Sequence, residues 1–118
     1  MIDAAHVVIY SKDAEAVRGF FRDVLGLSSV DAGHGWLIFA LPPAELGIHP
    51  TDSVTEEGRH QLYLMCDDIE KTVAELKLKG VEFTEPIKNA AFGLLTAMRI
   101  PGGSVLHLYQ PRHASPLK

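Results

Sequence analysis

Side chains that suit small-molecule recognition are scattered along this chain of 118 residues. Aromatic rings with polar tips and flexible thioethers are typical of apolar binding cavities. The same side chains also form ordinary core in a small domain, and both interpretations stay open. The candidates for lining such a cavity are Tyr10, Trp36, Tyr63, Met65 and Tyr109.

Charged and nucleophilic side chains indicate a catalytic or anion-binding site less clearly than the aromatic side chains indicate a cavity. Arg99 could bind an anionic group of a substrate, although an exposed arginine at the end of a strand explains it as well. The lone cysteine, Cys66, excludes an internal disulfide and indicates a reducing compartment. The sequence contains neither a Gly-x-Ser-x-Gly elbow nor a glycine-rich phosphate loop. Covalent catalysis and nucleotide chemistry are therefore disfavoured.

Composition and charge narrow the class of protein further. The chain is 47% hydrophobic and 22% charged, which is typical of a soluble globular domain. Its net charge is −4 and its basic residues are scattered, so nucleic acid is not expected as a partner. The longest apolar stretch, 36–44, is too short to span a membrane, and the N-terminus lacks the pattern of a signal peptide. We expect a single cytoplasmic domain over 1–118.

Hydrophobic periodicity predicts two modules joined by a polar linker at 51–59. The first module covers about 4–50. Its predicted elements are a strand at 6–10, a helix from Asp13 to Gly26, and strands at 28–32, 36–41 and 45–49.

The second module, about 60–111, repeats this order. Its predicted elements are a strand at 61–66, a helix from Asp68 to Gly80, and strands at 81–84, 93–100 and 104–110. Sliding the chain by 55 positions aligns His6 with Gln61 and Ile9 with Leu64, which indicates an internal duplication.

Alternation along the first strand of each module separates an aliphatic face, which should pack on the helix, from a mixed face. The aliphatic faces carry Val7 and Ile9 in the first module and Leu62 and Leu64 in the second. The mixed faces carry His6, Val8 and Tyr10 in the first module and Gln61, Tyr63 and Met65 in the second. Both first strands are therefore expected to offer polar residues to one cavity.

The tandem β-α-β-β-β arrangement resembles the vicinal oxygen chelate superfamily, which includes glyoxalase I, bleomycin resistance proteins and extradiol dioxygenases. The resemblance covers nearly all of 4–111 and is carried by the segments 5–10, 20–27, 67–69 and 101–103. It implies an α+β fold in which two tandem βαβββ modules form a concave, partly closed mixed sheet. The helices would lie outside this sheet and a ligand cavity inside it.

The resemblance also assigns four places at which metal-using members hold a divalent ion. In this chain those places carry His6, Gly47, Gln61 and His107. The two imidazoles and the amide oxygen could bind Fe, Mn, Ni or Zn. No carboxylate is among them, so the set lacks the anionic oxygen that many such sites use.

Two functions from different classes follow from the resemblance. One is a glyoxalase-like or bleomycin-resistance-like protein that binds a small molecule in its cavity without transforming it, and the missing carboxylates favour it. The alternative is a divalent-metal-dependent lyase, isomerase or dioxygenase acting on a substrate with vicinal oxygens. In that case Glu45 would be the general base, and His49, on the same predicted face, would line the pocket. Open sheet edges predict a homodimer for either function.

Overall fold

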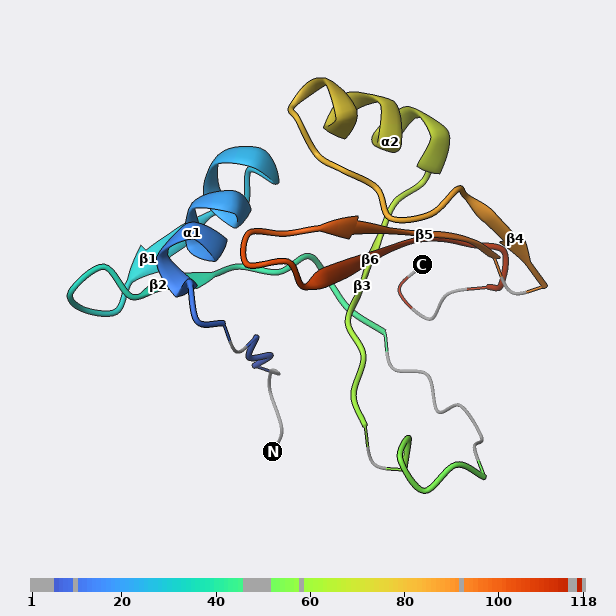
Figure 1. The fold of residues 1–118 in the computed structure, drawn as a ribbon, viewed down its shortest axis with the longest axis horizontal. Coiled ribbons are helices and arrows are strands. Elements are labelled where there is room, and N and C mark those ends of the chain that lie inside the picture. The colour runs from blue at the N-terminus through green and yellow to red at the C-terminus, as the bar shows by residue number, and fades with distance from the viewer. Residues whose placement is uncertain are drawn as a thin grey trace.

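The computed structural model describes residues 6–9, 11–45, 52–57, 59–91, 93–114 and 117. Within these residues the chain forms a two-stranded sheet, a four-stranded sheet and a small number of helical segments (Figure 1). The predicted α+β class is confirmed. In this described part of the chain, no helix has both the length and the apolar character needed to cross a membrane.

The second half of the chain folds in the predicted β-α-β-β-β order. Its elements are β3 (Tyr63–Met65), α2 (Ile69–Leu78), β4 (Lys88–Ala90), β5 (Gly93–Arg99) and β6 (Val105–Pro111). The strands lie in the order β3-β6-β5-β4, with β3 parallel to β6 and the other pairs antiparallel. Helix α2 covers one face of this mixed sheet (Figure 1), as expected for a module with its helix outside.

Helix α2 begins and ends where the sequence pattern predicts. The Asp68 side chain accepts a hydrogen bond of 3.1 Å from a backbone N–H of the first turn and so caps the helix. The apolar stripe of Ile69, Val73 and Leu76 is buried. After the helix the chain turns at Gly80, whose φ of +87° favours glycine.

The helix of the first half has two parts. Helix α1 (Ala14–Gly19) is α-helical, and η1 (Phe20–Val24) continues it as a π-helix in which the N–H of Leu25 donates to the carbonyl of Phe20. The helix ends as predicted at Gly26, which has a φ of +70°. Strand β1 (Ser29–Asp31) then pairs antiparallel with β2 (Leu37–Phe39) to form the smaller sheet.

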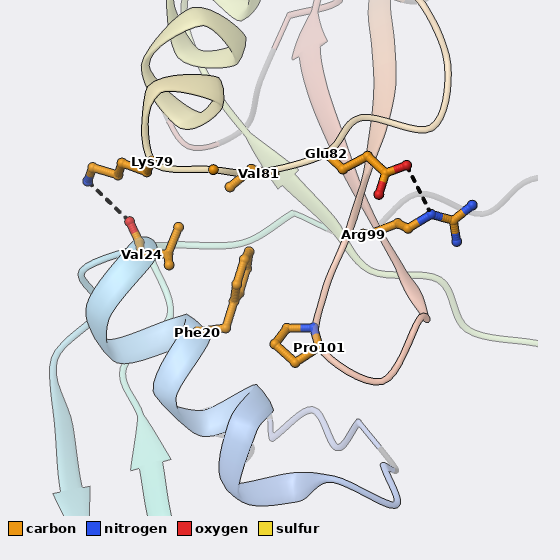
Figure 2. Close-up of a pocket in the computed structure, with 8 residues that line it drawn as sticks. Phe20, Val24, Lys79, Val81, Glu82, Arg99 and Pro101 are labelled. Carbon is orange, nitrogen blue, oxygen red and sulfur yellow. Dashed lines mark hydrogen bonds and ion pairs between the residues drawn. The ribbon is translucent and has the colours of Figure 1, made fainter.

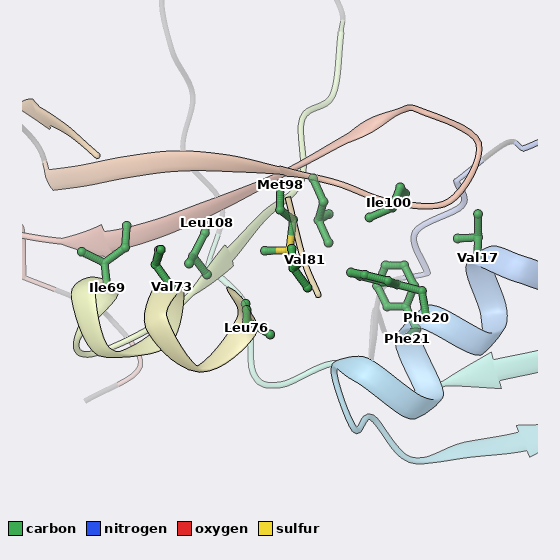
Figure 3. Packing of buried hydrophobic residues seen from close by; sticks show 11 residues of the cluster. Val17, Phe20, Phe21, Ile69, Val73, Leu76, Val81, Met98, Ile100 and Leu108 are labelled. Atoms are coloured by element: carbon green, nitrogen blue, oxygen red, sulfur yellow. The ribbon is translucent and has the colours of Figure 1, made fainter. Parts of the chain in front are cut away.

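One hydrophobic cluster joins the first half of the chain to the second (Figure 3). Phe20 and Phe21 of η1 are 9% and 6% exposed, and their rings meet edge to face with centroids 6.0 Å apart. Lys79, at the end of α2, adds a polar link because its Nζ donates to the carbonyl of Val24 at 3.2 Å. The buried members of the cluster are Val17, Phe20, Phe21, Ile69, Val73, Leu76, Val81, Met98, Ile100, Leu106 and Leu108.

The strand predicted at 6–10 is not formed by the described residues of that segment. Residues 6–9 belong to no strand, and Val7, Val8 and Ile9 are 49%, 56% and 39% exposed. A strand needs a neighbour to pair its N–H and C=O groups, and local alternation does not supply one. The candidates Tyr10, Gly47 and His49 lie outside the described residues.

The strands between α2 and β5 also differ from the prediction. The segment 81–84 makes only an isolated bridge between Phe83 and Met98. Strand β4 instead pairs with β5, and no pattern in the sequence predicts it. Two of its three residues, Lys88 and Asn89, are polar and exposed. Such short polar edge strands are expected to lack a hydrophobic alternation.

Phe21→Ala tests whether the cluster between the two halves stabilises the fold. Removing this buried ring should lower the free energy of unfolding by about 3–5 kcal/mol. Chemical denaturation measures the change, and Leu78→Ala is the control because Leu78 is 90% exposed on α2. The control should change stability by less than about 0.5 kcal/mol. Equal stability of the two variants would contradict this role for Phe21.

Candidate functional site on the sheet face opposite α2

Alternation along the strands divides the second sheet into two chemically different faces. Four leucines point to the α2 side and belong to or pack against the core cluster: Leu62, Leu64, Leu106 and Leu108. The residues between them therefore lie on the opposite side. We call this side the ring face, and its residues are Gln61, Tyr63, Met65, His107 and Tyr109. The predicted mixed face of the second module is confirmed.

The strand register brings the rings of this face together. Tyr63 pairs with His107, and Met65 pairs with Tyr109, across the parallel strands β3 and β6. The Tyr63 ring centroid lies 5.1 Å from that of His107 and 5.9 Å from that of Tyr109. Tyr63 and Met65 are 37% and 38% exposed, whereas Tyr109 is only 8% exposed. The ring face is thus an aromatic surface that is open at β3.

Glycine at position 93 makes room for the Tyr109 ring. A Cβ atom built on Gly93 would lie 2.5 Å from Cε1 of Tyr109 and would also collide with the carbonyl oxygen of Gln110. Real Cβ atoms do not approach other atoms so closely, so a side chain at this position would displace the ring or the backbone of β6. The absence of a side chain at Gly93 therefore determines where the Tyr109 ring lies.

The polar groups of the ring face are joined by hydrogen bonds. The Tyr63 hydroxyl donates to Oε1 of Gln61 at 3.0 Å, and Nε2 of Gln61 lies 2.9 Å from Nε2 of His107. An amide nitrogen only donates, so Nε2 of His107 accepts and the proton of a neutral ring is on Nδ1. The amide of Gln61 is thereby oriented by both neighbours.

A carboxylate from the first half of the chain lies at the Tyr109 end of the ring face. The side chain of Glu45 is 15% exposed, and its Oε1 lies 3.4 Å from Nε2 of His113. Burial raises the pKa of Tyr109, and the negative charge of Glu45 and the neighbouring Tyr63 raise it further. The ring of His113 lies beside that of Tyr109, with centroids 5.8 Å apart and an angle of 32° between the planes.

The donors at this place do not fit a divalent ion as they stand. Oε1 of Gln61 accepts from Tyr63, and Nε2 of His107 accepts from the amide of Gln61. Among the described residues, no group of three or more His, Cys, Asp or Glu is placed to hold a metal. His6, the third candidate ligand, is exposed. A divalent ion needs several free donors in one place, so no metal chemistry follows from this donor set.

Two further candidates lie away from the ring face. Trp36 is 61% exposed and stacks with Arg18, whose Cζ is 5.3 Å from the ring centroid. Arg99 forms an ion pair of 3.7 Å with Glu82. It borders a hollow of about 280 Å³ between η1 and the turn after α2, which Phe20 also lines (Figure 2).

His113, in the tail after β6, is exposed, but it also makes contacts that the sequence does not predict. Its contacts with Glu45 and Tyr109 join segments that are far apart in the sequence, and no local pattern around His113 indicates them. Cys66 lies on the helix-facing side as predicted, packed against the core. Burial raises the pKa of its thiol, which disfavours the reactive thiolate.

Comparisons with known proteins agree with this architecture. A family model for the Glyoxalase/Bleomycin resistance protein/Dioxygenase superfamily matches residues 4–108. The solved structure of lactoylglutathione lyase from Agrobacterium tumefaciens is 16% identical, covers 92% of each chain and superposes with a TM-score of 0.65. A superfamily member from Sphaerobacter thermophilus DSM 20745 is 23% identical over 92% of this chain and 98% of the other, with a TM-score of 0.59.

A third solved structure is somewhat closer in sequence. TnmS3, an antibiotic binding protein from Streptomyces sp. CB03234, is 26% identical over 94% of this chain and 99% of the other, with a TM-score of 0.62. No curated protein has a significantly similar sequence.

The hydrogen bond between Gln61 and His107 predicts the tautomer of the histidine. Nitrogen NMR of the imidazole should show neutral His107 with its proton on Nδ1, because Nε2 accepts from the amide. The exposed His34, in the turn between β1 and β2, is a control within the same spectrum. In the variant Gln61→Leu, neutral His107 should lose its preference for the tautomer with the proton on Nδ1. A proton on Nε2 in the unmodified protein would mean that the amide is reversed and its oxygen faces His107.

Proposed function

This chain belongs to the Glyoxalase/Bleomycin resistance protein/Dioxygenase superfamily, and on that basis we propose that it binds a small molecule at the ring face. The observation that carries the proposal is the row of rings formed by His107, Tyr63 and Tyr109, with the Glu45 carboxylate at one end. Aromatic surface with a few fixed polar groups is the usual composition of a small-molecule site.

The hydrogen bonds of the ring face favour binding over catalysis. The side chains of Tyr63, Gln61 and His107 bond to one another, so their polar atoms stabilise a fixed surface. The carboxylate of Glu45 lies beside the imidazole of His113. Such an arrangement orients a ligand without supplying a Lewis acid. The antibiotic binding attributed to TnmS3 agrees with a binding role for this fold.

A thermal-shift screen tests the proposed function. A ligand that binds only the folded state should raise the melting temperature, with about 2.7 kcal/mol of stabilisation at a hundredfold excess over its Kd. The screen should include planar aromatic compounds of positive, neutral and negative charge. Tyr63→Ala should weaken binding of any hit about tenfold because stacking area is lost. The control Leu78→Ala, on the opposite side of the sheet, should bind as the unmodified protein does. Equal affinity of both variants would place the ligand elsewhere.

We also propose that two copies of the chain form a homodimer. The aliphatic segment Val7–Ile9 is exposed, and β3 forms one edge of the four-stranded sheet. The small sheet of β1 and β2 has an apolar hollow of about 300 Å³ that Val30 and Phe39 line. A two-stranded sheet is marginally stable by itself. Among the described residues, Val7–Ile9 is an apolar segment outside any strand and β3 is an edge of its sheet. A second copy fits because a two-fold arrangement covers both at once.

Light scattering tests the dimer. The unmodified protein should have about twice the 12.9 kDa mass of one chain. Val7→Lys places a charge on the exposed aliphatic segment and should shift the protein toward the monomer, because burying an unpaired charge is costly. Leu78→Lys, a matched change at an exposed residue of α2, should leave the dimer intact. A monomer in the unmodified protein would contradict the proposal.

A further inference from the structure

A hollow of about 280 Å³ lies between the two halves of the chain (Figure 2). Phe20 and Val24 of η1 border it from the first half, and 79–82, Arg99 and Pro101 border it from the second. We call it the η1 pocket. No residue of the ring face lines it, and its buried residues belong to the core cluster on the α2 side of the sheet. The η1 pocket is therefore separate from the ring face.

The interior of the η1 pocket is apolar. Phe20 and Val81 are 9% and 8% exposed, and Val24 and Pro101 are partly buried. Clefts that hold drug-sized ligands have volumes of about 300–1,000 Å³. The η1 pocket lies just below this range, so it suits a smaller molecule with a single apolar ring. Such a molecule would contact both halves of the chain at once.

The charged side chains that border the η1 pocket leave one positive charge in excess. They are two cations, Lys79 and Arg99, and one carboxylate, Glu82. Glu82 forms an ion pair of 3.7 Å with Nε of Arg99. Within the part of the chain that the structure describes, no carboxylate pairs with Lys79. The charge in excess is therefore that of the Lys79 ammonium.

The Lys79 ammonium can bind an anion in addition to its present partner. Its Nζ donates to the carbonyl of Val24 at 3.2 Å, and an ammonium group has three N–H donors. The carbonyl orients the ammonium but has no net charge. The ends of α2 and η1 contribute only a partial negative charge, which is smaller than the full charge of the lysine. Lys79 thus keeps positive charge at the edge of an apolar space.

We propose that the η1 pocket binds a small monocarboxylate with one apolar ring. The ring lies among Phe20, Val81 and Pro101, and the carboxylate accepts hydrogen bonds from the Lys79 ammonium. One unpaired cation matches one negative charge, and the nearby Glu82 disfavours a doubly charged group such as phosphate. Because the ligand contacts both halves, its binding stabilises their packing. This inference does not depend on the function proposed for the ring face.

Titration of the full chain with phenylacetate and with its neutral isostere phenylacetamide tests the η1 pocket. Proton–nitrogen correlation spectra should show saturable shifts at the amides of Gly80 and Glu82, with a Kd of about 1 mM for phenylacetate. Phenylacetamide should bind at least about fivefold more weakly because it has no charge. Equal affinity of the two probes, or no saturable shift up to about 20 mM phenylacetate, would overturn the proposal.

Two substitutions with opposite expected effects test the charges. Lys79→Gln removes the positive charge, while the new amide can still donate to the Val24 carbonyl, so phenylacetate should bind at least about threefold more weakly. Glu82→Gln removes the negative charge and releases the Arg99 guanidinium, so phenylacetate should bind at least about twofold more tightly. A purely structural effect would weaken binding in both variants, and that result would contradict the proposal.

Control variants separate the η1 pocket from other places on the molecule. Lys77→Gln and Glu75→Gln make the same chemical changes at exposed residues of α2 and should leave the affinity for phenylacetate unchanged. Tyr63→Ala, on the ring face, should also leave it unchanged. If Tyr63→Ala weakens phenylacetate binding and Lys79→Gln does not, the probe binds at the ring face. The inference is then wrong, while the proposed function stands.

Discussion

Strand β6 lies between β3 and β5, and its register is the constraint on which the rest of the molecule depends. Leu106 and Leu108 point toward α2, while His107 and Tyr109 point to the ring face. A slip of one residue would exchange the two sets and bury polar groups in the core. Gln110 helps to hold the helix in place, because its Oε1 accepts a hydrogen bond of 2.8 Å from the first backbone N–H of α2.

The packing of the two halves supplies two features that the second module lacks by itself: a shared buried cluster and a carboxylate close to Tyr109. Phe20 and Phe21 share one buried cluster with the sheet and α2, so the first half is held against the second by burial of apolar surface. The first half also supplies Glu45, whose charge acts on Tyr109 in the second half. The ring face is therefore a property of the packed chain, since its rings and its carboxylate come from different modules.

A fold of this family does not determine a function by itself, because unrelated chemistries occur on the same scaffold. In this chain the function depends on the side chains at a few positions of the ring face. Gln61 bonds to both Tyr63 and His107, so polar atoms that could bind a metal bind each other instead. Tyr63 and Met65 on the same face remain partly exposed, which leaves stacking and charge as the means of recognition.

The sequence by itself determined the features that depend on neighbours along the chain. Caps such as Asp68, turns such as Gly80 and the alternation that places Tyr63 and Leu64 on opposite faces are all local, and the structure has them as predicted. Only the tertiary structure decided that His113 contacts both Glu45 and Tyr109, that β4 forms at 88–90, and that 6–9 stays outside any strand. Those features depend on which distant segments pack together, and packing is decided by the shape and burial of the whole chain rather than by the period of any one segment.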